Sequence, residues 1–236
     1  MRIKSEHPFW GYRRVWSYLR FREHKILNVK RIYRIMCENE LLVSRPALKA
    51  LRTNSNRSKP RAVKPNEYWG IDMTKVMIPS FGWVYVEVLL DWYTKQIIGY
   101  DIDIQSKNTH WLQALEMGVG AKFPDGAHGQ GVKLVSDNGS QPTSLSFMKA
   151  CSTLGIKQIF ASYSNPKGNA DTERVIRTLK EDIVYPYEYE TVEEFKEALE
   201  RWIKKYNEDF PHSTLGQLTP VEFEQKYKAN HNLFAA

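Results

Sequence analysis

The sequence lacks the features of secreted, zinc-binding and membrane-spanning proteins. It contains only two cysteines, Cys37 and Cys151, which are far apart and have no C-x-x-C spacing. They predict a reducing, cytosolic environment and argue against a zinc knuckle. No run of about 18 apolar residues exists, so a membrane span is not expected. The N-terminal stretch MRIKSEHPFWGYRR has no apolar core of the kind that a secretory signal needs.

Charge is distributed unevenly along the chain. Residues 1–66 contain 17 Lys and Arg against 4 Asp and Glu, a balance of +13. The rest of the chain contains 17 against 23, a balance of −6. Because concentrated positive charge attracts a polyanion and releases its counterions, nucleic acid is the leading partner. The alternative is a basic tail that only solvates the chain.

The basic segment has the periodicity of helices. Tyr12 to Arg22 has apolar residues at three- and four-residue spacing, and Asn28 is a candidate N-cap for a helix from Val29 to Glu38. Two short helices joined by roughly six residues are compatible with a helix-turn-helix-like unit. For the second helix we predict an inward face of Ile32, Ile35 and Met36, and DNA-facing cations at Lys30, Arg31 and Arg34.

Residues 52–66 predict an extended basic linker. This stretch has almost no apolar residues, and it combines two prolines with several cations. Its charge would let it track along DNA, with contacts expected at Arg57, Lys59 and Arg61.

From residue 67 onward, strands alternate with helices. Strand patterns cover 67–78, 83–93, 95–104, 132–136 and 157–162, and helical patterns cover 109–122, 145–154 and 170–182. This order predicts an α/β domain with a mixed five-stranded sheet flanked by helices. Capping boxes that begin at Thr191 and Thr219 predict two further helices without a chemical role.

Two aspartates stand out against the strand pattern. Asp72 lies within the apolar first strand, where an unpaired charge is costly. Asp137 ends the fourth strand, in LVSDNGSQ. Because Asn138-Gly139 is a strong hairpin signal, Asp137 has two interpretations, the start of a tight turn or a carboxylate aimed at a metal.

A third acid, Glu173, lies in the first turn of the helix predicted at 170–182. Arg177 and Lys180 follow four and seven residues later, on the same helix face. That face would present one acid to a metal and two cations to a phosphate backbone. The alternative is an ordinary surface ion pair between Glu173 and Arg177.

The acidic motifs WGIDMTK, VSDNGSQ and GNADTERVIRTLK together resemble those of the retroviral-integrase-like DDE transposases. Thirty-five residues separate Asp137 from Glu173, which is the interval of that family. HPFWGYRRVWSYLR and YNEDFPHSTLGQLTPVEF are similar to the segment before the core and to the tail of bacterial insertion-sequence transposases of the OrfB type. The resemblance covers the chain from about His7 to Phe223.

This resemblance implies an RNase H-like fold and a transposase that cleaves DNA and transfers strands during transposition of an insertion sequence. Asp72, Asp137 and Glu173 would hold two Mg²⁺ or Mn²⁺ ions, about 4 Å apart, at the attacking and departing oxygens. DNA would be the partner, both as element ends and as target, and the active complex would be a dimer or larger. The expected location is the bacterial cytoplasm, at the nucleoid, without membrane association.

The resemblance also suggests residues that position DNA. For His212 we expect a structural role, with a DNA contact as the alternative. The expected contacts are Ser140, Gln141, Asn169, Arg174, Arg177 and Lys180.

Four segments follow from these patterns: a helical DNA-binding domain at 1–51, the linker at 52–66, an RNase H-like integrase core at 67–190, and C-terminal helices at 191–236 that complete the core and tail. The His/Cys zinc module of retroviral integrases is not found in the sequence. Transposases of this type usually carry additional N-terminal helices that recognise element ends. Because the resemblance begins after those helices, two interpretations stay open. The chain is either shortened or a product without autonomous end recognition.

Other functional classes explain less of the sequence. An RNase H-type nuclease would share the metal chemistry but should lack the transposase tail and the basic arm. A tyrosine recombinase would need a site such as H-x-x-R, and none of the six histidines is followed by arginine at that spacing. A catalytically inert or domesticated DNA-binding remnant would explain the basic arm but not the retained acids.

Overall fold

The computed structural model describes residues 2–43, 60–161 and 168–232. The chain divides into two units. The sheet unit comprises Ser55–Leu179 and Glu188–Glu200, and the helical unit comprises Met1–Asn54, Lys180–Tyr187 and Arg201–Ala236. Among the described residues, no helix is long and apolar enough to span a membrane.

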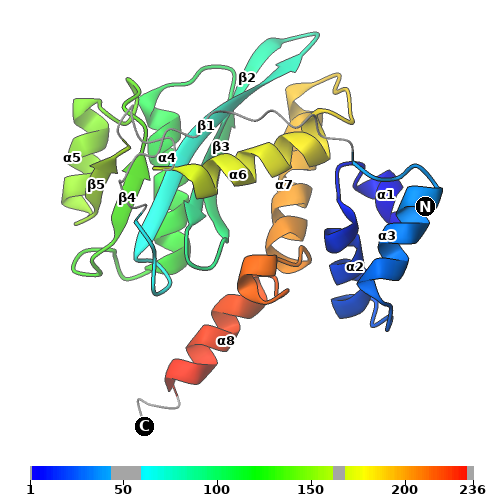
Figure 1. Ribbon diagram of the computed structural model, residues 1–236. Helices are drawn as coiled ribbons and strands as arrows, with labels where there is room; N and C mark the ends of the chain where they lie inside the picture. The colour runs from blue at the N-terminus through cyan, green and yellow to red at the C-terminus, as the bar shows by residue number, and fades with distance from the viewer. Residues whose placement is uncertain (1, 44–59, 162–167, 233–236) are drawn as a thin grey trace, which may run out of the picture. The chain divides into compact units, whose positions relative to one another are not determined.

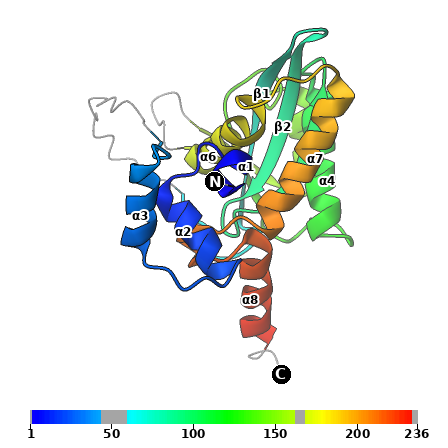
Figure 2. The same cartoon turned by 90° about the vertical axis from the view of Figure 1, so that its right-hand side faces the viewer.

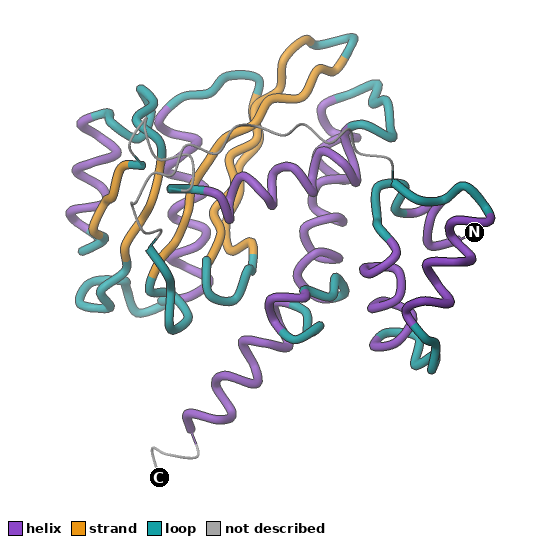
Figure 3. The backbone as a smooth tube through the Cα atoms, in the orientation of Figure 1, coloured by secondary structure: helices purple, strands orange, loops and turns teal. Residues whose placement is uncertain are grey.

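A mixed five-stranded sheet forms the centre of the sheet unit (Figures 1 and 3). Its strands are β1 (Tyr68–Ile78), β2 (Gly82–Asp91), β3 (Ile97–Asp103), β4 (Lys133–Ser136) and β5 (Lys157–Phe160). Short turns join β1, β2 and β3, so these strands pair antiparallel. Helices separate β3 from β4 and β4 from β5, and the pairs β1–β4 and β4–β5 are parallel. The order β3-β2-β1-β4-β5 confirms the predicted mixed sheet.

The two faces of β1 differ because side chains alternate along a strand. Trp69 and Ile71 belong to the apolar core, which also contains residues of α4 (Asn108–Lys122) and α5 (Leu145–Thr153). The opposite face carries Asp72 and is covered by α6 (Ala170–Leu179). Figures 1 and 2 show α4 and α6 on opposite sides of the sheet. The period of two therefore separates the core face from the face that bears the acid.

The predicted helix at 170–182 changes form at Lys180. The α-helix ends at Leu179 and continues as a π-helical turn, η1 (Lys180–Val184). In the helical unit, the buried Asp182 accepts a hydrogen bond from Trp202 Nε1 at 3.1 Å. Burial raises the pKa of Asp182 to about 6. A π-turn is wider than an α-turn, so the helical spacing that placed Lys180 beneath Glu173 does not continue past Leu179.

The predicted helices of the basic segment are present in the helical unit. The other helical elements of the unit are α1 (Arg2–Glu6), η1, the end of α7 (Val192–Glu208), η2 (Ser213–Leu215) and α8 (Pro220–Asn232). α2 (Tyr12–Phe21) and α3 (Val29–Glu38) match their expected bounds to within one residue, and the Asn28 side chain caps α3 by accepting from Lys30 N. Ile32 and Met36 are buried as predicted, but Ile35 is 41% exposed, so its inward assignment was wrong. A short surface helix buries only a narrow stripe, and Ile35 lies beside it.

The sequence predicts that residues 191–236 complete the core and tail. Glu188–Glu200 group with the sheet unit, whereas the described residues 201–232 group with the N-terminal helices. Trp10 stacks on His7 and packs edge-on against Phe210 at a centroid distance of 4.9 Å. Arg22 donates to both carboxylate oxygens of Glu222 in α8. Because each partner lies about 200 residues from the other, local sequence patterns could not indicate this grouping.

The end of the predicted linker belongs to the sheet unit. The Asn66 backbone N–H donates to Asp91 Oδ2 at 3.1 Å, and the Tyr93 N–H donates to Asp91 Oδ1 at 2.8 Å. Burial raises the pKa of Asp91, which caps the turn after β2. Residues 52–59 of the linker lie outside the described residues.

Candidate active site

The register of the sheet brings the backbones of Asp72 and Asp137 to the same level. β1 and β4 are parallel neighbours, with Trp69 opposite Leu134 and Gly70 opposite Val135. Asp72 lies two residues beyond Gly70, and Asp137 lies two residues beyond Val135. Adjacent strands are about 4.8 Å apart. The two acids are therefore neighbours at the end where β1 and β4 stop pairing.

Asp137 does begin a turn. Its Oδ1 accepts a hydrogen bond from the Gly139 N–H at 3.0 Å, and Asn138 Nδ2 donates to the Ala161 carbonyl at 3.2 Å. The Asp137 side chain is nevertheless exposed at the end of β4. The turn thus holds the carboxylate at the strand end, and the two interpretations from the sequence are compatible.

Glu173 reaches the same end of the sheet through α6. The Asn169 side chain donates from Nδ2 to the Ile71 carbonyl at 3.2 Å, directly beside Asp72 in β1. Asn169 in turn starts the helix, since its carbonyl accepts from the Glu173 N–H at 3.0 Å. Glu173 is therefore one helical turn beyond an anchor on β1, and its side chain is exposed.

A glycine in β1 allows α6 to lie this close. A Cβ on Gly70 would lie 2.1 Å from Thr172 Oγ1 and 2.3 Å from Trp92 Nε1, closer than real contacts allow. Trp92 Nε1 also donates to Thr172 Oγ1 at 3.1 Å. Lys95 pairs with Asp171 at 3.1 Å, so the first turn of α6 is held on the sheet through the two residues that precede Glu173.

The donor set of the three acids is suited to a hard divalent cation, because carboxylate oxygens are the ligands that Mg²⁺ and Mn²⁺ prefer. The structure aligns the backbones of Asp72 and Asp137 and places Glu173 on the first turn of α6, but it does not gather the three side chains. In the described part of the chain, no group of three or more His, Cys, Asp or Glu side chains could hold a metal ion as it stands. Asp72 Oδ1 accepts from the Met73 N–H at 2.8 Å, and Asp137 Oδ1 accepts from Gly139.

The residues predicted to contact DNA have different environments. In the helical unit, Lys30, Arg31 and Arg34 are exposed on α3. Arg61 is exposed at the start of the sheet unit, whereas Arg57 and Lys59 lie outside the described residues. The role of these cations in DNA binding stays a prediction.

In the sheet unit, Ser140, Arg174 and Arg177 are exposed. Lys180, which belongs to the helical unit, is half-buried. Asn169 differs from the expected DNA contact because its side chain is 5% exposed and anchors α6 to β1. Its Oδ1 has no hydrogen-bond partner among the described residues. In the helical unit, His212 packs edge-on against Tyr206 at 5.0 Å, a structural setting.

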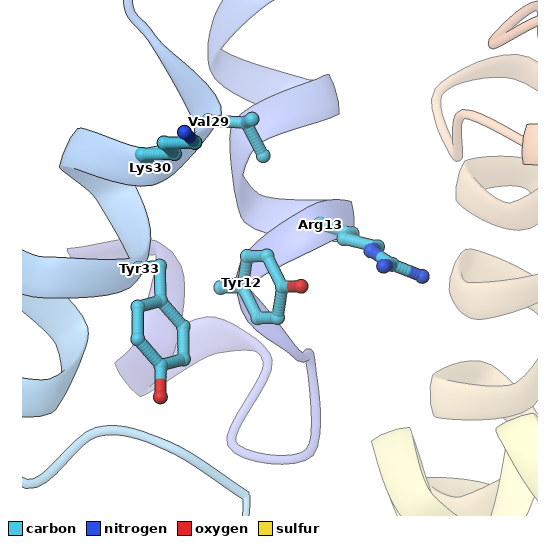
Figure 4. A pocket seen from close by; sticks show the side chains of 5 residues that line it. All are labelled: Tyr12, Arg13, Val29, Lys30 and Tyr33. Atoms are coloured by element: carbon cyan, nitrogen blue, oxygen red, sulfur yellow. The ribbon is translucent and has the colours of Figure 1, made fainter.

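The helical unit has a pocket that the sequence did not reveal. It has a volume of about 270 Å³ and is lined by Tyr12 and Arg13 of α2 and by Val29, Lys30 and Tyr33 of α3 (Figure 4). The two tyrosine rings pack edge to face at 5.1 Å. Aromatic rings beside cations are common where proteins contact single-stranded nucleic acid, so the pocket is a candidate contact. Only the tertiary pairing of the two helices forms it.

Sequence reasoning also missed Glu87, in the middle of β2. This carboxyl group is fully buried, and burial raises its pKa to about 7. The signal was present, since Glu87 is the only charged residue in the otherwise apolar stretch from Trp83 to Leu90. Its partners become visible only in the structure.

The comparisons with known proteins agree with this geometry. Residues 62–166 and 154–220 match two family descriptions, each an "Integrase core domain", and residues 1–49 match an "HTH-like domain". Transposase InsD of insertion element IS2 from Escherichia coli is 26% identical over 238 residues, covering 97% of this chain and 77% of that protein.

Solved structures show the same fold. The catalytic core domain of BIV integrase has a TM-score of 0.53 and 18% identity, covering 71% of this chain and 99% of that one. The HTLV-2 integrase catalytic core domain, in complex with magnesium and in a dimeric form, has a TM-score of 0.52 and 15% identity, covering 70% of this chain and 99% of that one. With an integrase core, an HTH-like domain and an insertion-sequence relative along nearly its whole length, the chain belongs to the integrase-like superfamily of DDE transposases, as an insertion-sequence transposase of the OrfB type.

Proposed function

We propose that Asp72, Asp137 and Glu173 are the catalytic acids and that they hold two Mg²⁺ or Mn²⁺ ions during DNA cleavage and strand transfer. The parallel register of β1 and β4, which sets Asp72 and Asp137 side by side, carries the proposal. The anchoring of α6 at Ile71 supports the inclusion of Glu173. The proposal requires the exposed Glu173 side chain, on the first turn of α6, to turn toward the two aspartates.

When bound, the cations would act as Lewis acids at the attacking and departing oxygens of an in-line displacement. The protein's part is to hold three carboxylates on rigid elements, two at strand ends and one on a helix. Such positioning removes much of the entropic barrier to reaction. Asp137 is held by its own turn, and Glu173 by the contacts that fix the start of α6.

The reaction would exchange phosphodiester bonds. In cleavage, a water oxygen bonds to phosphorus, the P–O3′ bond breaks, and the departing oxygen takes a proton to become a 3′-hydroxyl beside a 5′-phosphate. In strand transfer, that 3′ oxygen attacks a target phosphodiester, and the target's own P–O3′ bond breaks. The proton lost by the attacking hydroxyl is balanced by the one gained by the departing oxygen. Since one phosphodiester replaces another, no ATP is required.

DNA would be held by cations in both units. Lys30, Arg31 and Arg34 are exposed on α3, and Arg61, Arg174 and Arg177 are exposed in the sheet unit, as a phosphate contact requires. We retain Arg57, Lys59, Ser140 and Lys180 as further candidates. Because two element ends must be joined to one target, the active complex would be at least a dimer.

The first prediction concerns Asp72→Asn, which keeps the side-chain shape and removes the charge. We expect strand transfer to fall by more than about 100-fold, because loss of an outer-shell partner alone costs up to that much. DNA affinity should stay within about twofold. Strand-transfer assays on a labelled donor end with Mg²⁺ or Mn²⁺, together with gel shifts, measure both.

Asp125→Asn is the matched control, since Asp125 is an exposed aspartate in the loop after α4. If Asp72→Asn retained strand transfer, the triad assignment would be wrong. If the wild-type chain bound DNA but showed no cleavage or transfer, a binding-only remnant would be the better description. Cleavage without transfer would favour an RNase H-type nuclease.

A further inference from the structure

The feature that the proposed chemistry leaves unexplained is the buried Glu87 in β2. Its side chain is fully buried, its Oε1 accepts from Ser106 Oγ at 3.1 Å, and its Oε2 has no hydrogen-bond partner among the described residues. Burying a carboxyl group with an unpaired oxygen is costly, and an apolar side chain of similar size would cost less. Packing of the sheet therefore does not account for an acid here.

Glu87 is connected to the loop that carries Asp137. Ser106 lies between β3 and α4 and bonds to Glu87 through its hydroxyl. Gln141 Nε2 donates to both the Ser106 carbonyl and the Ser106 hydroxyl oxygen, each at 3.3 Å. Gln141 lies four residues after Asp137, in the same loop. A chain of three side chains thus runs from the centre of the sheet to the catalytic loop.

This network approaches the loop from the core side of the sheet. Glu87 pairs with Met73 of β1 and with Asp101 of β3, and so it lies on the face opposite Asp72. The titratable groups near Glu87 are Asp101 and His110 of α4, whose Nδ1 lies 2.8 Å from Asp101 Oδ2. Asp103 lies 3.9 Å from His110 Nε2.

A second contact joins the two helices that follow these loops. Asn108 Nδ2, at the start of α4, donates to Ser146 Oγ in the first turn of α5. Ser144 caps α5 by accepting from the Phe147 N–H, and its hydroxyl donates to the Gln141 carbonyl at 2.7 Å. The C-terminal end of the Asp137 loop is therefore fixed to α5. The middle of this loop is fixed to the sheet at Gln141, through Ser106.

We propose that Glu87 is a positioning residue that holds the Asp137 loop through Ser106 and Gln141. This inference rests on the proposed function of Asp137. Gln141 then acts inside the protein rather than as a DNA contact. Because a misplacement of about 1 Å can cost about 100-fold in rate, a buried anchor for this loop has a direct catalytic consequence.

The test compares Glu87→Leu, Glu87→Gln and Ser106→Ala in the full chain. Glu87→Leu removes the acceptor, whereas Glu87→Gln keeps the shape and an oxygen for Ser106. We expect Glu87→Leu and Ser106→Ala to raise the rate of amide hydrogen exchange of residues 137–141 by about tenfold. Both variants should also bind Mn²⁺ more weakly in a titration without DNA. Their strand-transfer rate should fall by up to about 100-fold at unchanged DNA affinity. Glu87→Gln should restore all three.

Ser152→Ala, at an exposed serine of α5, is the control and should match the wild type. Ser106→Ala keeps the test valid if Glu87→Leu does not fold, since Ser106 is only half-buried in a loop. If exchange in residues 137–141 were unchanged in Ser106→Ala, the inference would be overturned. Failure of the proposed function can be told apart from failure of this inference, because hydrogen exchange reports on the loop even in a chain without strand transfer.

Discussion

At the scale of single residues, burial of Glu87 makes stability depend on pH. Its pKa is raised to about 7, so the folded protein holds a proton that the unfolded chain releases at lower pH. The stability that this bound proton contributes is fully present below the unfolded pKa. It is lost as pH rises through the folded pKa of about 7. Asp182, whose pKa burial raises to about 6, titrates in the same range, and burial also raises the pKa of Asp91. The contribution of Glu87 therefore has to be isolated by comparison with a variant.

We predict that Glu87→Gln removes this dependence. Relative to the wild type, the variant should gain up to about 3 kcal/mol of unfolding free energy between pH 5 and pH 8, roughly 1.4 kcal/mol for each unit of pKa shift. Urea denaturation at several pH values measures it. A constant difference between the two proteins across this range would contradict the assignment.

Gly70 makes a second prediction at this scale. In Gly70→Ala the new Cβ would collide with Thr172 Oγ1 and Trp92 Nε1, so the start of α6 must move. We expect a loss of about 1–3 kcal/mol of stability and reduced strand transfer, as overpacking usually causes. Chemical denaturation and the strand-transfer assay measure the two effects.

The matched control for this variant is Gly120→Ala. Gly120 lies in α4, and no atom would contact its added Cβ within 4 Å. Because alanine favours a helix over glycine, this variant should be as stable as the wild type or more stable by up to about 1 kcal/mol. If Gly70→Ala behaved in the same way, the close approach of α6 to β1 would be wrong.

At the scale of secondary-structure elements, α2 and α8 are joined by one ion pair within the helical unit. The Arg22 guanidinium, through its hydrogen bonds, lowers the pKa of Glu222 to about 2. The Thr219 N–H donates to Glu222 Oε2 at 3.0 Å, and the Glu222 N–H donates to Thr219 Oγ1 at 3.2 Å. Glu222 therefore stabilises both the start of α8 and its contact with α2.

We predict that Glu222→Gln lowers the melting temperature at pH 7 and that the difference disappears as pH falls toward 2. The folded pKa lies below the unfolded one, so the stabilisation is present above the unfolded pKa and is lost on acidification. Calorimetry at pH 7, 5 and 3 checks this. Glu208→Gln, at an exposed position near the end of α7, should show no such trend.

At the scale of the whole molecule, the uneven charge predicts salt-sensitive DNA binding. Replacing Lys30, Arg31 and Arg34 together by alanine should weaken binding to any DNA sequence. It should also reduce the slope of log affinity against log salt by up to about 3, because each lost phosphate contact removes about 0.9 from the slope. Fluorescence anisotropy over a range of salt concentrations measures the slope.

The control for this experiment removes three other exposed cations, namely Lys196, Lys204 and Lys226. The two triple variants have the same net charge. If both reduced the slope equally, overall charge rather than the α3 surface would explain DNA binding.

Local sequence patterns determined most elements of this protein. Alternation defined β1, β2 and β3, Asn28 set the start of α3, and the Thr219–Glu222 capping box set the start of α8. These features depend on interactions within a few residues, so they are readable from the chain. The interval between Asp137 and Glu173 likewise carried the family resemblance without any coordinates.

Only the tertiary structure decided which distant groups meet. The pairing of β1 with β4, the seating of α6 over Gly70, and the path from Glu87 to Gln141 join segments that lie far apart in the sequence. The π-turn after Leu179 and the grouping of residues 201–232 with the N-terminal helices are of the same kind. Side chains brought together by long-range packing leave no periodic signal, because each has its partner on another element.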